Sequence, residues 1–392
     1  MLLAPNQAER ALGDEIRAFL DAHRDATQDI PHDFDERVRF LRDWQDKLHG
    51  AGLVGLSWPR EHGGRGTTLT EQIIANQVFA QAGAPPVIGS VGLDVVGPSL
   101  IDHGTEEQKA RFLPRILSAQ DIWCQGFSEV GAGSDLAALK TRASVRDDRF
   151  VITGHKVWTS YAQHSEWCAV LARTDPDAAG HKGISYLLVD MRSPGIEIRP
   201  LVQSTGDPEF GEVYLESVEV PRANLLGELH GGWRIAMHTL AHERGWYGVG
   251  RQVILRVLFE RLVDDARRTM RDGRPSIECP EVRSALTQAH IGLEVLRHQG
   301  YRSVGKMLAD GHPGLESSVD KIVLARVEQR LVSVALDVLG PLAALGSASA
   351  GGVDVDEWQR VYLYGRAASV YGGSEQIQKN IIAERILGLP RT

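Results

Sequence analysis

The sequence predicts an α+β protein in which helices come first, strands follow and helices return. Apolar residues recur every three or four positions in residues 1–121 and again in 228–392, which is the spacing of amphipathic helices. Residues 122–227 instead consist of short runs rich in Val, Ile, Tyr and Trp that turn residues separate. We therefore expect an N-terminal helical domain (1–121), a middle β domain (122–227) and a C-terminal domain like a four-helix bundle (228–392).

The N-terminal domain opens with a predicted amphipathic helix. Its first residues, MLLAPNQAERALGDEIRAFLDAHR, place acids and arginines between apolar residues at helical spacing, which is unlike a signal peptide. Three further segments have the same periodicity, and breakers such as WPREHGGRG and AGAPP separate them: residues 40–51, 69–82 and 106–117.

The middle and C-terminal domains differ in the lengths of their elements. Runs such as RFVITGHKVWTS and FGEVYLESVEVP alternate apolar and polar residues, which predicts six to eight strands in a barrel or sandwich with one buried face. The C-terminal helices are expected at residues 233–271, 280–310, 316–340 and 375–387. Lengths near 30 residues favour an antiparallel bundle.

The composition excludes several classes of protein. Hydrophobic residues make up 43% and charged residues 24% of the chain, with a net charge of −8. This balance is ordinary for a globular protein and argues against binding to nucleic acid or to an anionic membrane, which needs basic faces. Nowhere do eighteen apolar residues run together, so no membrane span is expected. Cys124, Cys168 and Cys279 show no CxxC spacing and fit a reducing cytoplasm.

Two motifs in the middle domain expose groups that bind ligands. SEVGAGSDLAALKTRA begins at Ser128 and lacks the third glycine of a dinucleotide-binding turn, but it offers backbone N–H groups and the hydroxyls of Ser128 and Ser134. GHKVWTSYA places Trp158 before two hydroxyl residues at a strand end. This arrangement predicts an aromatic wall with hydrogen-bond donors beside it, and a buried core tryptophan is the alternative.

A third motif, VYGGSEQIQKNIIAER, occupies residues 370–385. Gly372 and Gly373 leave the main chain bare just before a helix N-terminus, where orphan N–H groups suit a polar or anionic ligand. The alternative is an ordinary glycine-rich turn with Ser374 as the N-cap.

Together with the α–β–α order, these motifs resemble those of the acyl-CoA dehydrogenase family, whose signatures have the forms TEPGAGSD, KxWITN and YEGTxxIQ…IAR. The resemblance covers residues 5–390 and implies a noncovalently bound FAD, with its isoalloxazine between the β domain and the C-terminal helices. Val130 stands where the family usually has proline. The residues that the resemblance places at FAD are Gln125, Phe127, Ser128, Trp158, Ser160, Ser374 and Gln376. Those that it places at the acyl substrate are Ser134, Arg244, Gly372 and Gly373.

The family's reaction needs a carboxylate that removes a proton from the carbon alpha to a thioester, while hydride leaves the beta carbon for the flavin. Many members carry this glutamate in the third motif, where Gly372 stands here. Members of the isovaleryl, long-chain and steroid-side-chain types carry it on the first helix after the β domain, and Glu243 occupies that position. Glu375 is the alternative base, although an acid there also stabilises a helix N-terminus. A surface glutamate paired with Arg244 is the structural alternative for Glu243.

The order HxxxHE formed by His238, His242 and Glu243 differs from the HExxH of zinc peptidases, so we expect no metal site.

The resemblance implies dehydrogenation of an acyl thioester to its trans-2-enoyl form, with electrons passed to an electron-transfer flavoprotein. The carrier is CoA or an acyl carrier protein, and the absence of a side chain at Gly372 favours a branched, long or bulky acyl group. The stretches that hold FAD across a subunit interface depart from the family pattern at residues 271–275 and 337–341, which lack the usual Phe and Gln. The sequence therefore leaves two kinds of assembly open. One is a homotetramer or homodimer, and the other is a heterotetramer with a paralogous subunit. The alternative functions are a noncatalytic half-site subunit and a flavin monooxygenase of the same fold.

Overall fold

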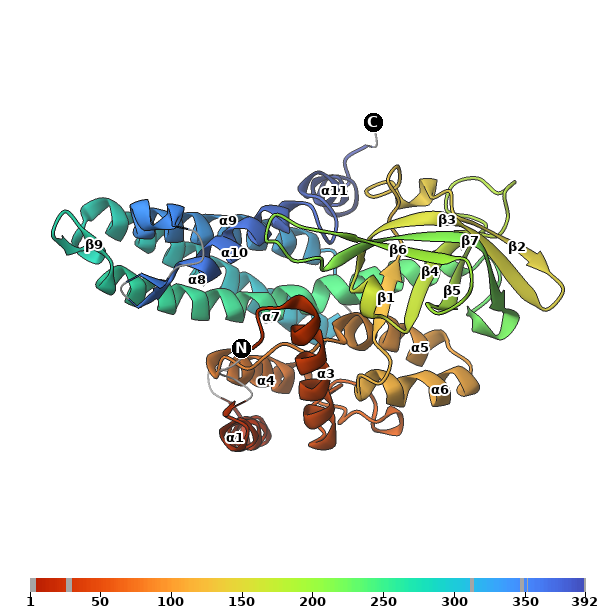
Figure 1. Cartoon of the computed structure of the whole chain (residues 1–392), viewed down its shortest axis with the longest axis horizontal. Coiled ribbons are helices and arrows are strands. Elements are labelled where there is room, and N and C mark those ends of the chain that lie inside the picture. Colours follow the sequence, from red (N-terminus) through yellow and green to blue (C-terminus); the bar gives the residue numbers. More distant parts are fainter. Residues whose placement is uncertain (1–4, 26–29, 311–313, 346–348, 351, 391–392) are drawn as a thin grey trace. The chain divides into compact units, whose positions relative to one another are not determined.

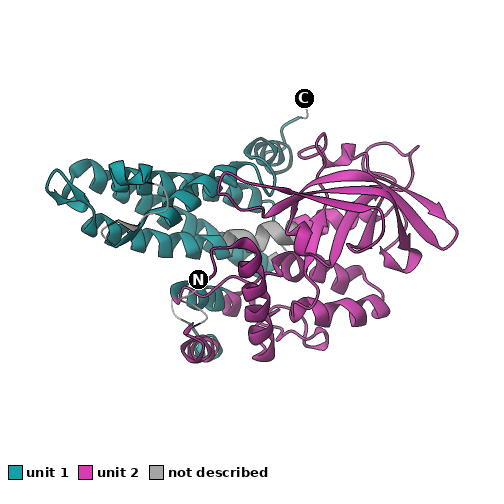
Figure 2. Cartoon of the chain, in the orientation of Figure 1, with its two compact units in different colours: residues 1–11, 73–81, 244–392 teal, residues 12–72, 82–243 magenta. Residues whose placement is uncertain are grey.

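The structure, a computed structural model, describes residues 5–25, 30–310, 314–345, 349–350 and 352–390. Within these ranges, the side chains of residues 241–249, 310 and 349–350 are not described. The chain divides into two units, shown in Figure 2. Unit 1 comprises residues 1–11, 73–81 and 244–392, and unit 2 comprises residues 12–72 and 82–243.

The helices of the N-terminal region begin at residues that cap them. Asp33 accepts a hydrogen bond from the Glu36 N–H at the start of α3, and Thr105 forms a capping box with Gln108 at the start of α6. A π-helical turn at Val91–Val96 leads directly into α5. The helices are α1 (Gln7–Ala22), α3 (Phe34–Gly50), α4 (Leu69–Gln81), α5 (Gly97–His103) and α6 (Glu106–Leu117), as Figure 1 labels them.

Unit 2 contains an eight-stranded sheet with the order β6-β7-β3-β2-β4-β5-β8, in which β1 pairs in parallel with β4. Most residues of β4 and β5 are buried, whereas β3 and β7 alternate, as expected for strands with one covered face. The strands are β1 (Trp123–Gly126), β2 (Arg142–Arg146), β3 (Arg149–Ser160), β4 (Trp167–Arg173), β5 (Ile184–Asp190), β6 (Ile196–Leu201), β7 (Phe210–Pro221) and β8 (Leu225–Leu226).

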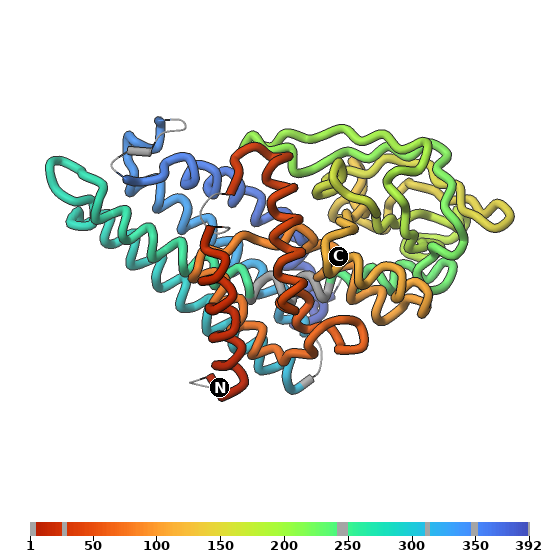
Figure 3. The backbone as a smooth tube through the Cα atoms, turned by 60° about the horizontal axis from the view of Figure 1, so that its bottom comes forward, coloured from red at the N-terminus to blue at the C-terminus, as the bar shows by residue number. Residues whose placement is uncertain are grey.

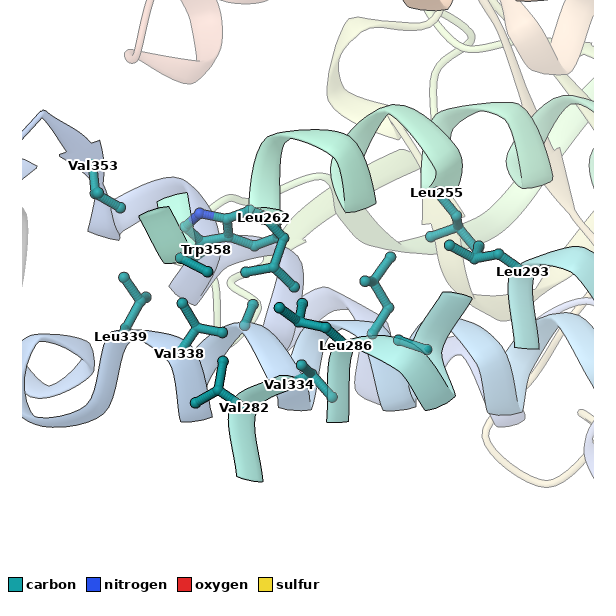
Figure 4. Close-up of a cluster of buried hydrophobic side chains, with 14 of the residues drawn as sticks. Leu255, Leu262, Val282, Leu286, Leu293, Val334, Val338, Leu339, Val353 and Trp358 are labelled. Atoms are coloured by element: carbon teal, nitrogen blue, oxygen red, sulfur yellow. The ribbon is translucent and has the colours of Figure 1, made fainter. Parts of the chain in front are cut away.

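Unit 1 is a bundle of helices around an apolar core. Figure 4 shows Leu255 and Leu262 from α7, Leu286 from α8 and Val334 from α9 in this core, together with Trp358 from α10. The helices are α7 (Gly232–Arg268), α8 (Pro280–Asp310), α9 (Ser317–Leu339), α10 (Val355–Gly365) and α11 (Glu375–Ile381), the last continued by a π-helical turn at Ile382–Ile386. The division between the two units falls within α7.

Two short hairpins join the helices of unit 1. The first consists of β9 (Met270–Arg271) and β10 (Arg274–Pro275), and lies at the tip where α7 turns back to α8 (Figures 1 and 3). Its two turn residues, Asp272 and Gly273, both have positive φ, as the tightest hairpin turns require. The second hairpin consists of β11 (Ser349–Ala350) and β12 (Val353–Asp354).

These observations confirm the predicted fold class and the order helices, strands, helices. The helices at Glu106–Leu117 and Pro280–Asp310 have the expected bounds, and the sheet has a strand count within the expected range. Helix α10 was not expected, although Asp354 caps it and Trp358 anchors it in the core. The predicted domain boundaries at 121 and 227 stay predictions. No helix of the described residues is long and apolar enough to cross a membrane.

Asp265 gives a test of how the bundle is held together. Its carboxylate is 1% exposed and accepts hydrogen bonds from the Trp358 indole N–H (2.7 Å) and from Arg268 (2.6 Å). Asp265→Ala leaves a buried indole donor unpaired, so we expect it to lower the free energy of unfolding by about 2–4 kcal/mol. The neighbouring Asp264, which is exposed and pairs with Arg267, provides the matched control Asp264→Ala, with an expected loss below about 0.5 kcal/mol. Equal losses of stability in denaturant titrations of the two variants would contradict this assignment.

Candidate active site

Trp158 is the most exposed aromatic feature of the sheet. Its side chain is 62% exposed although it lies within β3, and its backbone has a φ of +60°. The pairing of β3 with β7 shifts register between Lys156 and Thr159, so Trp158 occupies a β-bulge. A bulky residue with positive φ is strained and persists only where its surroundings enforce the conformation. The bulge therefore turns a large flat ring outward, where it meets Phe210 edge to face.

The loop that follows β1 runs beside this bulge. The carbonyl of Ser128 accepts a hydrogen bond from the Val157 N–H (3.0 Å), and Phe127 packs its buried ring against Tyr186. Glu129 and Ala132 exchange both backbone hydrogen bonds, so the chain reverses tightly between them. Val130 at the tip of this turn is exposed, and so is Ser134 further along. The structure thus brings Ser128 close to Trp158 and leaves Ser134 on the surface of unit 2, and their roles at FAD and at the acyl substrate stay predictions.

A buried ion pair underlies the loop. Lys156 is 0% exposed, and its ammonium donates to the Phe127 carbonyl (3.1 Å) and to Glu129 Oε1 (2.8 Å). Glu129 also accepts from the N–H groups of Lys140 (2.7 Å) and Thr141 (2.9 Å). Burial raises the pKa of Glu129, but the Lys156 charge and these hydrogen bonds outweigh it, so the pKa lies below its usual value. Burial lowers the pKa of Lys156, and Glu129 opposes that change.

Two buried polar groups, one on β1 and one on β3, have no hydrogen-bond partner among the described residues. They are the amide nitrogen of Gln125 on β1 and the hydroxyl of Thr159 on β3, and both atoms are buried. Buried donors are normally paired, and an exception needs an explanation such as an absent ligand. Gln125 belongs to the predicted site, whereas Thr159 does not. The only signal for Thr159 was its place as the first of the two hydroxyl residues after Trp158.

The glycine-rich turn of unit 1 has a local structural reason. Gly372 and Gly373 have φ values of +63° and +92°, which favour glycine. Gln378, which is fully buried on α11, donates its amide N–H groups to both glycine carbonyls at 3.3 Å. A Cβ atom on Gly373 would lie 2.4 Å from that amide nitrogen and would force the Gln378 side chain to move, which adds to the preference for glycine that the φ of +92° sets. The structure confirms Ser374 as the N-cap of α11, since its hydroxyl accepts from the Ile377 N–H.

Lys321 holds the residues that precede this turn. Its ammonium donates to the Ala368 carbonyl at 2.6 Å and lies 4.2 Å from the centre of the Tyr371 ring. No motif predicts this contact, because Lys321 lies on α9, 47 residues before Ala368. Gln376, which is predicted to contact FAD, is exposed. The fully buried glutamine of α11 is Gln378.

Glu375 lacks the properties of a general base. It pairs with Lys379 (2.8 Å) and Arg326 (2.6 Å), and hydrogen bonds from these two cations lower its pKa. A general base that works on a weakly acidic carbon needs the opposite change. This finding weighs against Glu375 as the alternative to Glu243.

The side chains of Glu243, Arg244 and His242 lie outside the described residues, so their predicted roles stay predictions. The helix α7 continues through these positions. One turn earlier, the buried Thr239 shares a hydrogen bond of 2.6 Å with Ser99 of α5. His238 lies 3.6 Å from Asp102, and the described residues contain no group of three potential metal ligands.

The chain thus combines an N-terminal helical region, an eight-stranded sheet with an outward-turned Trp158, and a C-terminal helical bundle with a capped glycine turn. Residues 6–120, 124–218 and 230–387 match the sequence profiles of the N-terminal, middle and C-terminal domains of acyl-CoA dehydrogenases. The chain belongs to the acyl-CoA dehydrogenase family, whose members are oxidoreductases and generally depend on a flavin.

Similar proteins include the acyl-CoA dehydrogenase IpdE1 of Mycobacterium tuberculosis, which is 43% identical over 91% of this chain and 89% of its own. IpdE1 of Mycolicibacterium smegmatis is 41% identical over 91% of this chain and 89% of its own. Among solved structures, a steroid ACAD named Tcur3481-Tcur3483 has a TM-score of 0.86 and 29% identity over 100% of both chains. The ChsE4-ChsE5 complex of Mycobacterium tuberculosis has a TM-score of 0.87 and 28% identity, also over 100% of both chains.

The described groups of unit 2 fit the flavin that the family uses. The unpaired donors of Gln125 and Thr159 suit the oxygen and nitrogen acceptors of an isoalloxazine, and the exposed Trp158 ring suits its flat face.

The Glu129 carboxylate should make stability depend on pH. Because its pKa is lower in the folded than in the unfolded protein, its contribution is present above the unfolded value near 4.5 and is lost as the pH falls through the folded value. We expect Glu129→Gln to lower the melting temperature at pH 7 and to lower it less at pH 4 and below. Melting temperatures between pH 3.5 and 7 test this, with the exposed Glu216→Gln as control. A difference from native protein that stays constant over this range would refute the assignment.

Proposed function

We propose that this chain is an FAD-dependent acyl-CoA dehydrogenase that converts an acyl thioester to its trans-2-enoyl form. The observation that carries the proposal is the exposed ring of Trp158 in a strained bulge of β3, together with the unpaired donors of Thr159 on the same strand and Gln125 on β1. Bound FAD would accept the hydride from the beta carbon. Gln125, Phe127, Ser128, Trp158 and Ser160 would hold it on unit 2, and Ser374 and Gln376 on unit 1.

Glu243 is the proposed catalytic base, and Arg244 follows it as a proposed substrate residue. Two features support this assignment: Gly372 offers no carboxylate at the other family position, and the nearby Glu375 is bound to Arg326 and Lys379. Removal of the alpha proton requires a carboxylate held away from water, because water would lower its basicity.

The proposed substrate is a thioester with a branched, long or bulky acyl group, carried on CoA or on an acyl carrier protein. The similarity to proteins titled steroid ACAD supports a bulky group, and so does the absence of a side chain at Gly372 and Gly373. Ser134 is the proposed contact of unit 2 with the acyl chain.

An electron-transfer flavoprotein is the proposed electron acceptor, and a paralogous chain is the proposed subunit partner. The hairpin at residues 271–275 has Arg274 where the family usually has Phe, and Asp337 is exposed at the end of α9, where the family usually has Gln. The acid at 337 would repel the FAD pyrophosphate, so a partner would have to supply that half of a cofactor site. The ChsE4-ChsE5 structure is a complex of two differently named chains, which supports this arrangement. The three free cysteines fit a cytoplasmic location.

The departures from the family pattern at residues 271–275 and 337–341 also favour one other function, that of a noncatalytic subunit that completes a partner's site. A flavin monooxygenase of this fold is the remaining alternative. Anaerobic bleaching of the bound flavin by an acyl-CoA, without reduced nicotinamide, would support the dehydrogenase and exclude both alternatives.

Substitution of the base tests the mechanism directly. We expect Glu243→Gln to lower kcat on the best of a panel of acyl-CoAs by about 10²–10⁴-fold while FAD stays bound, because the amide cannot accept the alpha proton. Glu375→Gln is the matched control and should keep kcat within a few-fold of native enzyme. Retained turnover in Glu243→Gln would remove Glu243 from the mechanism.

The oligomeric state tests the proposed partner. Expressed alone, the chain should contain less than one FAD per subunit, whereas co-expression with a paralogous acyl-CoA dehydrogenase chain should give a stable heteromer with more FAD. Size-exclusion chromatography with mass analysis and flavin absorbance measures both quantities. A stable homotetramer that is fully loaded with FAD would reject a paralogous partner.

A further inference from the structure

The cation of Lys156 lies where a stable sheet core would favour an apolar side chain. Val213, its partner across the sheet on β7, is buried and belongs to the core of unit 2, and Lys156 itself is 0% exposed. A buried charge loses its hydration, and its attraction to a partner often does no better than well-packed apolar side chains of similar volume. The ion pair with Glu129 is therefore poorly explained by stability alone.

The pair connects three segments that are separate in sequence. Through the Phe127 carbonyl and Glu129 it holds the loop after β1, and through the N–H groups of Lys140 and Thr141 it holds the end of that loop before β2. Lys156 itself lies on β3. The 127–141 loop is thus bound at its start to the ammonium of Lys156 and at its end to the carboxylate of Glu129, and these two groups bind each other.

The strained bulge begins directly after Lys156. Val157, the next residue, donates its N–H to the Ser128 carbonyl, and Trp158 follows with its positive φ. A strained backbone needs neighbouring contacts that over-determine it. Lys156 supplies such a contact on one side of Trp158, and the fully buried Thr159 lies on the other.

We propose that the Lys156–Glu129 ion pair is a positioning device that fixes the 127–141 loop and the Trp158 bulge in the arrangement that receives the flavin. Neither residue touches the cofactor in this proposal; they act through Ser128, Val157 and Trp158. The role toward the flavin rests on the proposed function, whereas the ordering of the loop does not depend on it.

The test uses the full-length chain with the double substitution Lys156→Met/Glu129→Gln, which removes both charges and keeps similar side-chain volumes. The single substitution Lys156→Met leaves an unpaired buried carboxylate and should lower the melting temperature, whereas the double variant should melt near the native temperature. Arg115→Met/Asp121→Asn is the matched control, because it removes another ion pair of unit 2 that involves a buried carboxylate.

Hydrogen exchange measures how well the 127–141 loop and the Trp158 bulge are ordered when no cofactor is bound. In the double variant we expect the amides of Lys140, Thr141 and Val157 to exchange at least tenfold faster, while amides of β4 and β5 keep their native rates. The control variant should exchange the same three amides at the native rate. Native exchange at these amides in the double variant would overturn the proposal, whatever the protein's function.

FAD binding by the double variant measures how the loss of the ion pair affects the cofactor site. We expect the Kd for FAD, from flavin fluorescence, to rise at least tenfold and the visible circular dichroism of bound flavin to change. Faster exchange with an unchanged Kd and unchanged dichroism would overturn the positioning role. Native protein that takes up no FAD, alone or with a partner chain, would instead refute the proposed function, and this result is obtained before any substitution.

Discussion

The candidate site depends on main chain that is held in place by buried polar side chains. A loop of small residues such as the one after β1 offers N–H groups to a ligand but contributes little apolar surface of its own to a core. Its position must be fixed from below, and Lys156 with Glu129 does this in unit 2. Unit 1 uses the same solution, because Lys321 and Gln378 hold the carbonyls that lead into and through the glycine turn.

Much of the fold could be predicted because it follows from periodicity. The helices at Glu106–Leu117 and Pro280–Asp310 carry apolar stripes bounded by a capping threonine and a proline, so their limits were readable. Helix α10 was missed although its start carries a local pattern. Asp354 caps it, and the apolar residues Val355, Trp358 and Val361 follow at helical spacing and pack in or against the core of unit 1.

The candidate site was predictable in its residue types and not in its geometry. The exposed ring of Trp158 agrees with the predicted aromatic wall, but neither its positive φ nor the bulge follows from the motif. The pairing of Lys156 with Glu129 joins residues that are 27 positions apart, and neither motif predicts it. On α11, Gln376, which is predicted to contact FAD, is exposed, whereas Gln378, two residues later and on another face of the helix, is buried and holds the glycine turn.

The turn at residues 271–275 does not explain the departure from the family pattern there. Asp272 and Gly273 fill the two turn positions, where positive φ suits Asp-Gly, but the family pattern leaves both positions open. The missing Phe belongs to position 274, where Arg274 pairs with Arg271 across the hairpin. Because the turn does not select the residue at 274, the loss of the aromatic ring is a change of side chain and not of backbone conformation. Arg274 places a positive charge close to Asp272 in the chain, so the proposed need for a partner chain depends on the missing ring and on the acid at Asp337.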